Sequence, residues 1–271
     1  MILKSFTLPL FAIFTPFVGE QIMTDSGLER IISHTTFHNT ATAPDFYQAK
    51  VTPDSLFNRY YKSTGGVPLW DGIKTFSAKQ KITSPSAVSY DVILNADLET
   101  QSVHKSRIAM KREFIYVSKP QDGWLKIPIG GTDKATKYQV NGLNATEKAN
   151  LTGEMYNSLA PFYHYKTRGL IASYVGSETV NGVKVEHVEL QGKGTIYNLY
   201  FDANTHLLVQ AREKSGGTEF VRNYSDYVKS KSGITYPSKI VEVNAKDKKS
   251  TTISVSDLVI NPVIDKALFQ K

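Results

Sequence analysis

The chain has 271 residues, 41% of them hydrophobic, which is enough for one substantial core and common for a single β-rich domain. It contains no cysteine, which excludes disulfides, thiolate metal sites, cysteine nucleophiles and a lipidated N-terminal cysteine. Its net charge of +7 arises from 32 basic and 25 acidic residues dispersed along the chain, a mild excess that excludes a concentrated basic arm.

The N-terminus has the features of an export signal. Lys4 precedes an apolar run, Phe6 to Val18, which has the length of a signal-peptide core and is too short to cross a bilayer comfortably. We therefore predict a signal peptide over residues 1–19. Residues 20–51 are rich in Thr, His and Asn and show no sustained periodicity, so we expect a weakly structured leader there.

The first predicted helix begins after Thr52. A threonine can cap a helix, Pro53 suits the first helical position, and the carboxylate of Asp54 complements the helix dipole. Four residues with apolar bodies then share one helical stripe: Leu56, Phe57, Tyr60 and Tyr61. The pair Gly65-Gly66 predicts the end of this helix.

The middle of the chain predicts strands and a second helix. Strands are expected over residues 73–82, 87–96 and 107–117, and a turn at 121–123 leads into a further extended run. Asn144 and Glu147 form a capping box, and apolar residues at four-residue spacing follow it: Leu151, Met155 and Leu159. We predict a helix there.

Residues 171–260 predict an antiparallel meander. Short runs of alternating apolar and polar residues are separated by turn signals such as Asn181-Gly182 and Gly216-Gly217, which supply the positive backbone dihedrals of tight hairpins. In the last run, one charged residue is expected on the apolar face with three apolar ones: Asp257 with Ile253, Val255 and Val259.

The order of these elements predicts an α+β fold. It consists of a strongly curved antiparallel sheet of about ten strands, an incomplete β-barrel, covered by about two helices. A curved sheet that is apolar on one face must bury that face, either against helices alone or against helices and a ligand.

The sequence carries no catalytic or metal-binding motif. It lacks a nucleophile elbow, a phosphate-binding loop, a dinucleotide fingerprint and a zinc-protease motif, so we expect no enzyme activity and no cofactor. His34 and His38 stand four residues apart without a nearby acid, so no metal site is expected. The basic residues are not interleaved with aromatic residues in a recognisable module, which argues against a nucleic-acid partner.

The densest basic run is residues 104–112. It fits a solvated strand face plus a turn. The alternative interpretation is a contact for anionic lipid head groups or for an acidic partner surface.

Landmarks in a fixed order carry a resemblance to a known family. Gly65-Gly66 follows an amphipathic helix, and a strand opens with the sequence WDGIK at 70–74. Further landmarks follow: Asp122-Gly123-Trp124 with Ile127-Pro128, Gly176 with Val180-Asn181-Gly182, Leu199-Tyr200-Phe201-Asp202, Gly233-Ile234 with Tyr236-Pro237, and Asn261 with Ile264-Asp265 and Leu268-Phe269. Over residues 52–271 the chain resembles the periplasmic outer-membrane lipoprotein-sorting family, which is LolA/LolB-like.

The resemblance implies a periplasmic protein with an apolar cavity under its helices. The expected function is a non-catalytic exported carrier or binding protein for a lipid or the acyl chains of a lipoprotein. Seven residues are candidates for the lining of the cavity: Leu56, Tyr60, Leu151, Met155, Leu159, Trp70 and Trp124. The five helix residues fit an ordinary filled core equally well, and the two tryptophans are more often structural than ligand-contacting. The alternative function is therefore an envelope interaction or scaffold module that docks on another envelope protein or on an anionic membrane surface.

Overall fold

The computed structural model describes residues 51–85, 87–130 and 137–271. The predicted signal peptide at 1–19 and, apart from Val51, the predicted leader at 20–51 lie outside these residues and stay predictions. Within the described residues, no helix is both long enough and apolar enough to span a membrane.

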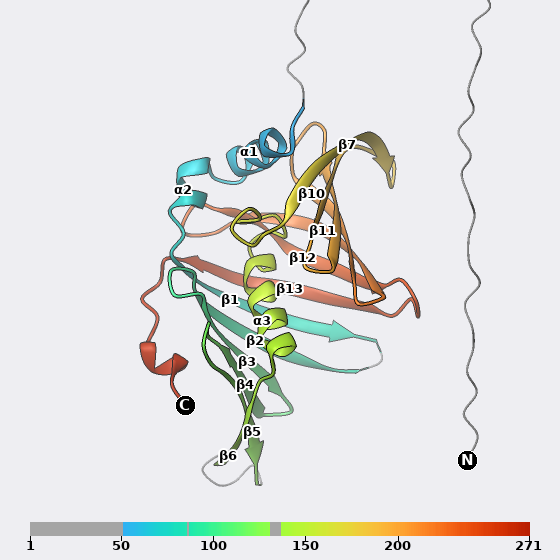
Figure 1. Ribbon diagram of the computed structural model, residues 1–271. Helices are drawn as coiled ribbons and strands as arrows, with labels where there is room; N and C mark the ends of the chain where they lie inside the picture. The colour runs from blue at the N-terminus through green and yellow to red at the C-terminus, as the bar shows by residue number, and fades with distance from the viewer. Residues whose placement is uncertain (1–50, 86, 131–136) are drawn as a thin grey trace, which may run out of the picture. The chain divides into compact units, whose positions relative to one another are not determined.

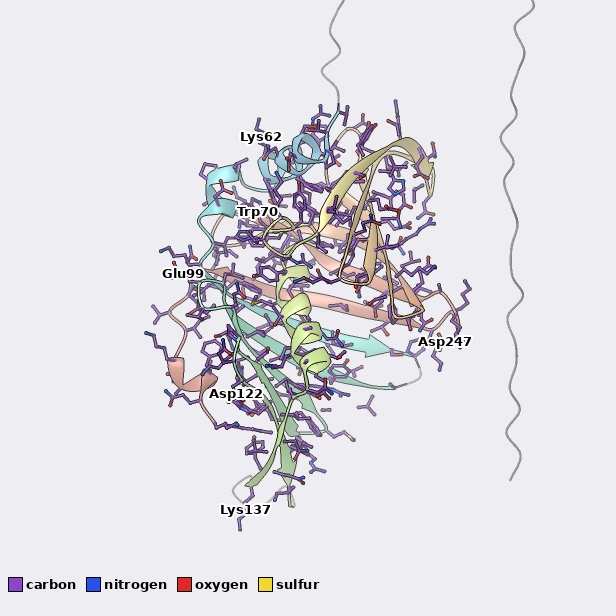
Figure 2. All side chains as sticks on the ribbon, viewed as in Figure 1. Lys62, Trp70, Glu99, Asp122, Lys137 and Asp247 are labelled. Carbon is purple, nitrogen blue, oxygen red and sulfur yellow. The ribbon has the colours of Figure 1, made fainter. Side chains whose placement is uncertain are left out.

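Two helices open the described chain. Helix α1, Pro53–Ser63, begins where the sequence predicts, because the Thr52 hydroxyl accepts from the Ser55 amide and the Ser55 hydroxyl accepts from the Thr52 amide. Helix α2, Val67–Asp71, is a short turn that was not predicted. It carries Trp70 (Figure 2), whose indole donates to the Thr64 hydroxyl at 3.0 Å and is almost fully buried.

The described residues form one 13-stranded antiparallel sheet (Figure 1). The strand order is β6-β5-β4-β3-β2-β1-β13-β12-β11-β10-β9-β8-β7. The strand bounds are β1 Thr75–Ser84, β2 Ala87–Asp97, β3 Ser102–Ala109, β4 Arg112–Ser118, β5 Gly123–Ile129, β6 Lys137–Gly142, β7 Ile171–Val180, β8 Val183–Gly192, β9 Thr195–Asp202, β10 Leu208–Ser215, β11 Thr218–Lys229, β12 Thr235–Asn244 and β13 Ser250–Ile260. The sheet is open, because β6 and β7 are its two edges. The predicted α+β fold with an incomplete barrel is confirmed.

A tight turn that was not predicted is one reason why the sheet has more strands than the ten expected. The predicted strand at 107–117 is wrong, because Met110 and Lys111 adopt φ values of 48° and 63° and form the hairpin turn between β3 and β4. The hairpin predicted at Asn181-Gly182 is confirmed, with φ values of 50° and 80° between β7 and β8.

A β-bulge changes which residues of β13 are buried. Lys79 pairs with Asp257 whereas Gln80 pairs with Val255, so β13 carries one extra residue at this point. Leu258 is consequently 4% exposed and Val259 is 39% exposed. The prediction that Val259 and Asp257 share the apolar face with Val255 is wrong, because the extra residue reverses the alternation.

Helix α3, Ala145–Asn157, crosses one face of the sheet (Figure 1). Its predicted capping box is confirmed, since Asn144 Oδ1 accepts from the Glu147 amide and Glu147 accepts from the Asn144 amide. The Lys105 ammonium reaches Glu154 of α3 at 2.6 Å. We call this face, on which Lys105 lies, the inner face, and the other the outer face. A short 3-10 helix, η1 Lys266–Phe269, ends the chain.

Candidate functional site

The inner face of the sheet and the helices above it enclose the main core. Because side chains alternate between faces along each strand, every second residue of β1, β2 and β3 points to the inner face, and paired residues point to the same face. The core is rich in aromatic rings. Phe162, in the segment after α3, packs with ring centroids 4.5 Å from Phe57 and 5.1 Å from Tyr60. This aromatic packing fixes α1 and the segment after α3 onto the sheet.

A small cavity of about 30 Å³ remains between the C-terminal end of α3 and the inner face. It has room for about two water molecules. The covering side is the segment Asn157–Pro161 together with Tyr60 of α1. The sheet side is formed by residues of five strands: Gln80, Leu208, Tyr224, Tyr227, Tyr236, Pro237, Ile240, Val255 and Leu258. The lining is therefore mostly apolar and aromatic, with a few polar groups.

Three tyrosines of the cavity are deeply buried phenols. Burial raises the pKa of Tyr60, Tyr224 and Tyr227 above the ordinary value of a tyrosine. They are uncharged over the physiological pH range. The Tyr227 hydroxyl donates to the carbonyl oxygen of Leu208 at 2.8 Å. These rings give the cavity neutral, amphipathic walls.

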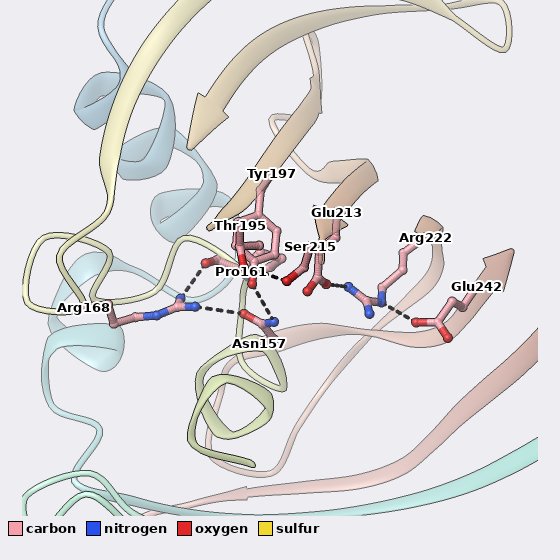
Figure 3. A network of polar contacts seen from close by, with 9 residues as sticks. All are labelled: Asn157, Pro161, Arg168, Thr195, Tyr197, Glu213, Ser215, Arg222 and Glu242. Carbon is pink, nitrogen blue, oxygen red and sulfur yellow. Dashed lines mark hydrogen bonds and ion pairs between the residues drawn. The ribbon is translucent and has the colours of Figure 1, made fainter. Parts of the chain in front are cut away.

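A polar network borders the cavity at the end of α3 (Figure 3). The guanidinium of Arg168 donates to the carbonyl oxygen of Pro161 at 2.6 Å and to Asn157 Oδ1 at 3.2 Å. Asn157 Nδ2 in turn donates to the Tyr197 hydroxyl at 3.3 Å. These bonds hold the covering segment over β9.

A second part of the same network lies on β10, β11 and β12. Arg222 donates to Glu242 at 2.7 Å and also pairs with Glu213. All three side chains are half-buried. Two carboxylates surround one guanidinium here, and Glu213 also interacts electrostatically with Arg168 of the first part of the network.

Comparison with known proteins gives the fold. No protein-family model and no curated protein matches the sequence. A solved domain from Vibrio parahaemolyticus named for outer membrane lipoprotein sorting aligns at 15% identity over 80% of this chain and 95% of its own, with a TM-score of 0.55. A LolA superfamily protein from Nitrosomonas europaea aligns at 14% identity over 82% and 99%, with a TM-score of 0.54. The chain has a LolA-like fold. A DUF1329 family protein from Desulfovibrio piger shares it, at 11% identity over 80% and 96%, with a TM-score of 0.52.

In this LolA-like fold, six of the seven predicted lining residues lie in one core. These residues are at most 6% exposed: Leu56, Tyr60, Trp70, Leu151, Met155 and Leu159. Of the six, only Tyr60 and Leu159 line the cavity. The amphipathic stripes therefore predicted burial under the helices, but they did not distinguish the packed residues from those beside the open space.

Trp124 lies apart from the other six candidates. It pairs with Val117 of β4, which pairs with His104 of β3. Paired residues point to the same face, and His104 is adjacent to Lys105 of the inner face, so Trp124 points to the outer face. The C-terminal segment covers it there, since the Lys271 ammonium lies 5.5 Å from the centroid of its ring. The structure does not bring Trp124 together with the cavity.

Tyrosines from the second half of the chain were not predicted from the sequence to line the cavity. Tyr224 and Tyr227 stand three residues apart, and in a regular strand they would lie on opposite faces. Asp226 between them has a φ of 54°, which interrupts the alternation, and both rings line the cavity. The clustering of tyrosines between residues 224 and 236 was the signal that could have found them.

A wider cleft of about 270 Å³ lies at the surface between α1 and the segment after α3. The rings of Phe57 and Phe162 form its floor. At its rim Asp54 accepts hydrogen bonds from Lys166 and Tyr165, each at 2.8 Å. The bonds from Lys166 and Tyr165 hold the pKa of Asp54 below its ordinary value.

The basic run at 104–112 does not form one surface. Lys105 and Arg107 lie on the inner face, whereas His104 lies on the outer face and is 6% exposed. Burial lowers the pKa of His104. Among the described residues no group of three or more His, Asp or Glu side chains could hold a metal ion.

Proposed function

We propose that the protein is a non-catalytic, exported carrier or binding protein for an apolar ligand in the cell envelope, most directly a lipid or the acyl chains of a lipoprotein. The observation that carries this proposal is the cavity between the end of α3 and the inner face of a LolA-like sheet. The name of the Vibrio parahaemolyticus domain refers to outer membrane lipoprotein sorting, which supports acyl chains as the ligand and the periplasm as the location.

A carrier of this structure must move the cover of its cavity before a lipid can enter, because the cavity is small. A volume of about 30 Å³ is far below the 300–1,000 Å³ typical of ligand pockets. Besides the apolar packing of Leu159, the polar contacts that hold the cover are the ion pair of Lys105 with Glu154 and the bonds of Arg168 to Pro161 and Asn157. Displacing the covering segment would expose the tyrosine-lined inner face. Each methylene of the ligand that is buried contributes about 0.8 kcal/mol, so the affinity should rise with the length of the acyl chain.

A second candidate function is an envelope interaction module with a filled core. The small cavity favours it, as does Met155 on α3, which is fully buried and does not line that cavity. Such a module would bind another envelope protein or an anionic membrane surface and no small ligand.

One experiment separates the two functions. The full chain is purified without detergent, its native mass spectrum is recorded, and the sample is extracted for lipids. A stoichiometric adduct that extracts as lipid is the expected result. A bare protein that also takes up no environment-sensitive fatty-acid probe would reject the carrier and favour the interaction module.

A further inference from the structure

Arg107 is an unpaired cation on the inner face. It lies on β3, two residues beyond Lys105, and therefore points to the same side as α3. Its guanidinium carbon lies 4.2 Å from the centroid of the Tyr90 ring. Its Nε is buried and has no hydrogen-bond partner. Across the described part of the chain, Arg107 makes neither a hydrogen bond nor an ion pair.

The other arginines around the cavity are bound. Arg168 donates to backbone carbonyls and to Asn157, and Arg222 pairs with two carboxylates. A guanidinium carries five donors, and buried donors in proteins are almost always satisfied. The contact with the Tyr90 ring positions the guanidinium of Arg107 while its donors stay without acceptors, an arrangement that suits an oxyanion.

Arg107 lies in the same cross-strand row of side chains as Gln80, which lines the cavity. Gln80 of β1 lines the cavity, it pairs with Val92 of β2, and Val92 pairs with Arg107 of β3. Neighbouring strands are about 4.8 Å apart, so the Cα atoms of Gln80 and Arg107 are separated by roughly 10 Å. Val92, between them, is 2% exposed and provides an apolar floor.

The two polar side chains of this row are unpaired, and one of them carries a positive charge. The Gln80 side-chain amide, like Arg107, makes no hydrogen bond within the described residues. Lys105, the nearest cation on the same strand face, is neutralised by Glu154. The β3 side of the inner face is thus left with the unpaired positive charge of Arg107, whereas on β10 to β12 Arg222 is paired with two carboxylates. An amphiphile in the cavity would be oriented with its anionic end toward β3.

We propose that Arg107 binds the anionic head group, a carboxylate or a phosphate, of an amphiphilic ligand whose apolar chain occupies the cavity. The inference rests on the proposed function and specifies the chemistry of its ligand. Tyr90 holds the guanidinium in place, and Gln80 offers an amide to the ligand where its chain enters the cavity.

The test compares ligands that share a chain and differ in the head group. Binding of hexadecanoate, hexadecyl phosphate and hexadecanol is measured by displacement of a fatty-acid probe, with the full-length protein and with Arg107→Met. The variant Arg212→Met is the control, because Arg212 carries the same charge on the outer side of the sheet, where it bonds to Gln210 and lies over Tyr200.

Loss of a charge-assisted contact should weaken binding of both anionic ligands about ten- to hundred-fold in Arg107→Met and leave hexadecanol unchanged. Arg212→Met should match the wild type for all three. In the wild type, affinity for hexadecanoate should fall as salt rises and affinity for hexadecanol should not, a measurement that does not depend on the folding of any variant. Inorganic phosphate alone should not compete at the concentrations at which hexadecyl phosphate binds.

Three outcomes would overturn the proposal. Equal, salt-independent binding of the acid and the alcohol would remove the head-group site and leave the carrier function standing. Competition by free phosphate at the same concentrations would make Arg107 a site for a free anion. Binding of none of the three ligands by the wild type would refute the carrier function, and this inference with it.

Discussion

Replacing Leu159 with alanine should weaken the fold and open the cavity at the same time. Leu159 is 5% exposed, belongs to the core and lines the cavity from the covering side. The substitution removes about three methylene equivalents, about 2.4 kcal/mol at about 0.8 kcal/mol each. If about 50 Å³ of the vacated space stays empty, the cavity adds about 1.2 kcal/mol at about 24 cal/mol per Å³.

The free energy of unfolding should therefore fall by about 3 to 4 kcal/mol. For a chain of this size the corresponding decrease in Tm is about 7 to 14 °C. Because the vacated space adjoins the existing 30 Å³, the variant should also bind a fatty-acid probe more tightly than the wild type. Urea unfolding and probe titration on the same samples measure both effects.

Leu151→Ala is the matched control. Leu151 is 6% exposed in the same core, on α3, but does not line the cavity. It should lose similar stability without any gain in probe binding. If both variants gain affinity equally, or if neither does, the space beside Leu159 is not where the ligand binds. A loss below about 1 kcal/mol for Leu159→Ala would refute the packing on which the calculation rests.

Two further predictions concern the contacts that hold the covering segments. Arg168→Met should cost about 2 to 4 kcal/mol in urea unfolding, because it leaves the buried carbonyls of Pro161 and Tyr163 without their donor; a loss below about 0.5 kcal/mol would contradict this role. Asp54→Asn tests the rim of the outer cleft. Lys166 and Tyr165 lower the pKa of Asp54 in the folded state, so its contribution is present above the unfolded value of about 3.9 and is lost as pH falls through the lower folded value. The stability difference between wild type and Asp54→Asn should be constant above about pH 5 and shrink below about 3.9; a difference unchanged from pH 6 to pH 3 would refute the assignment.

Local chemistry made two of the helices and one of the hairpin turns predictable. The cap at Thr52 with Pro53 and the capping box at Asn144 depend only on residues up to three positions apart, so the sequence located the starts of α1 and α3. The hairpin at Asn181-Gly182 likewise depends on two residues that tolerate positive φ. From the order of these helices and turns the sequence predicted the α+β fold and a curved sheet covered by helices.

Contacts between distant segments determined which side chains face the cavity. The bulge where β1 meets β13 reversed the faces of Leu258 and Val259, and no pattern within β13 alone reveals it. The placement of Trp124 under the C-terminal segment and of Arg107 beside Tyr90 depended in the same way on strand register.

The sequence by itself determined which face of α1 and of α3 would be buried, because amphipathic periodicity records the preference of each side chain for water or core. Only the tertiary structure decided how those residues pack, and hence that Leu159 lines the cavity while Met155 does not. The physical reason is that a cavity is a property of the volumes contributed by several elements at once, here α1, the end of α3 and five strands.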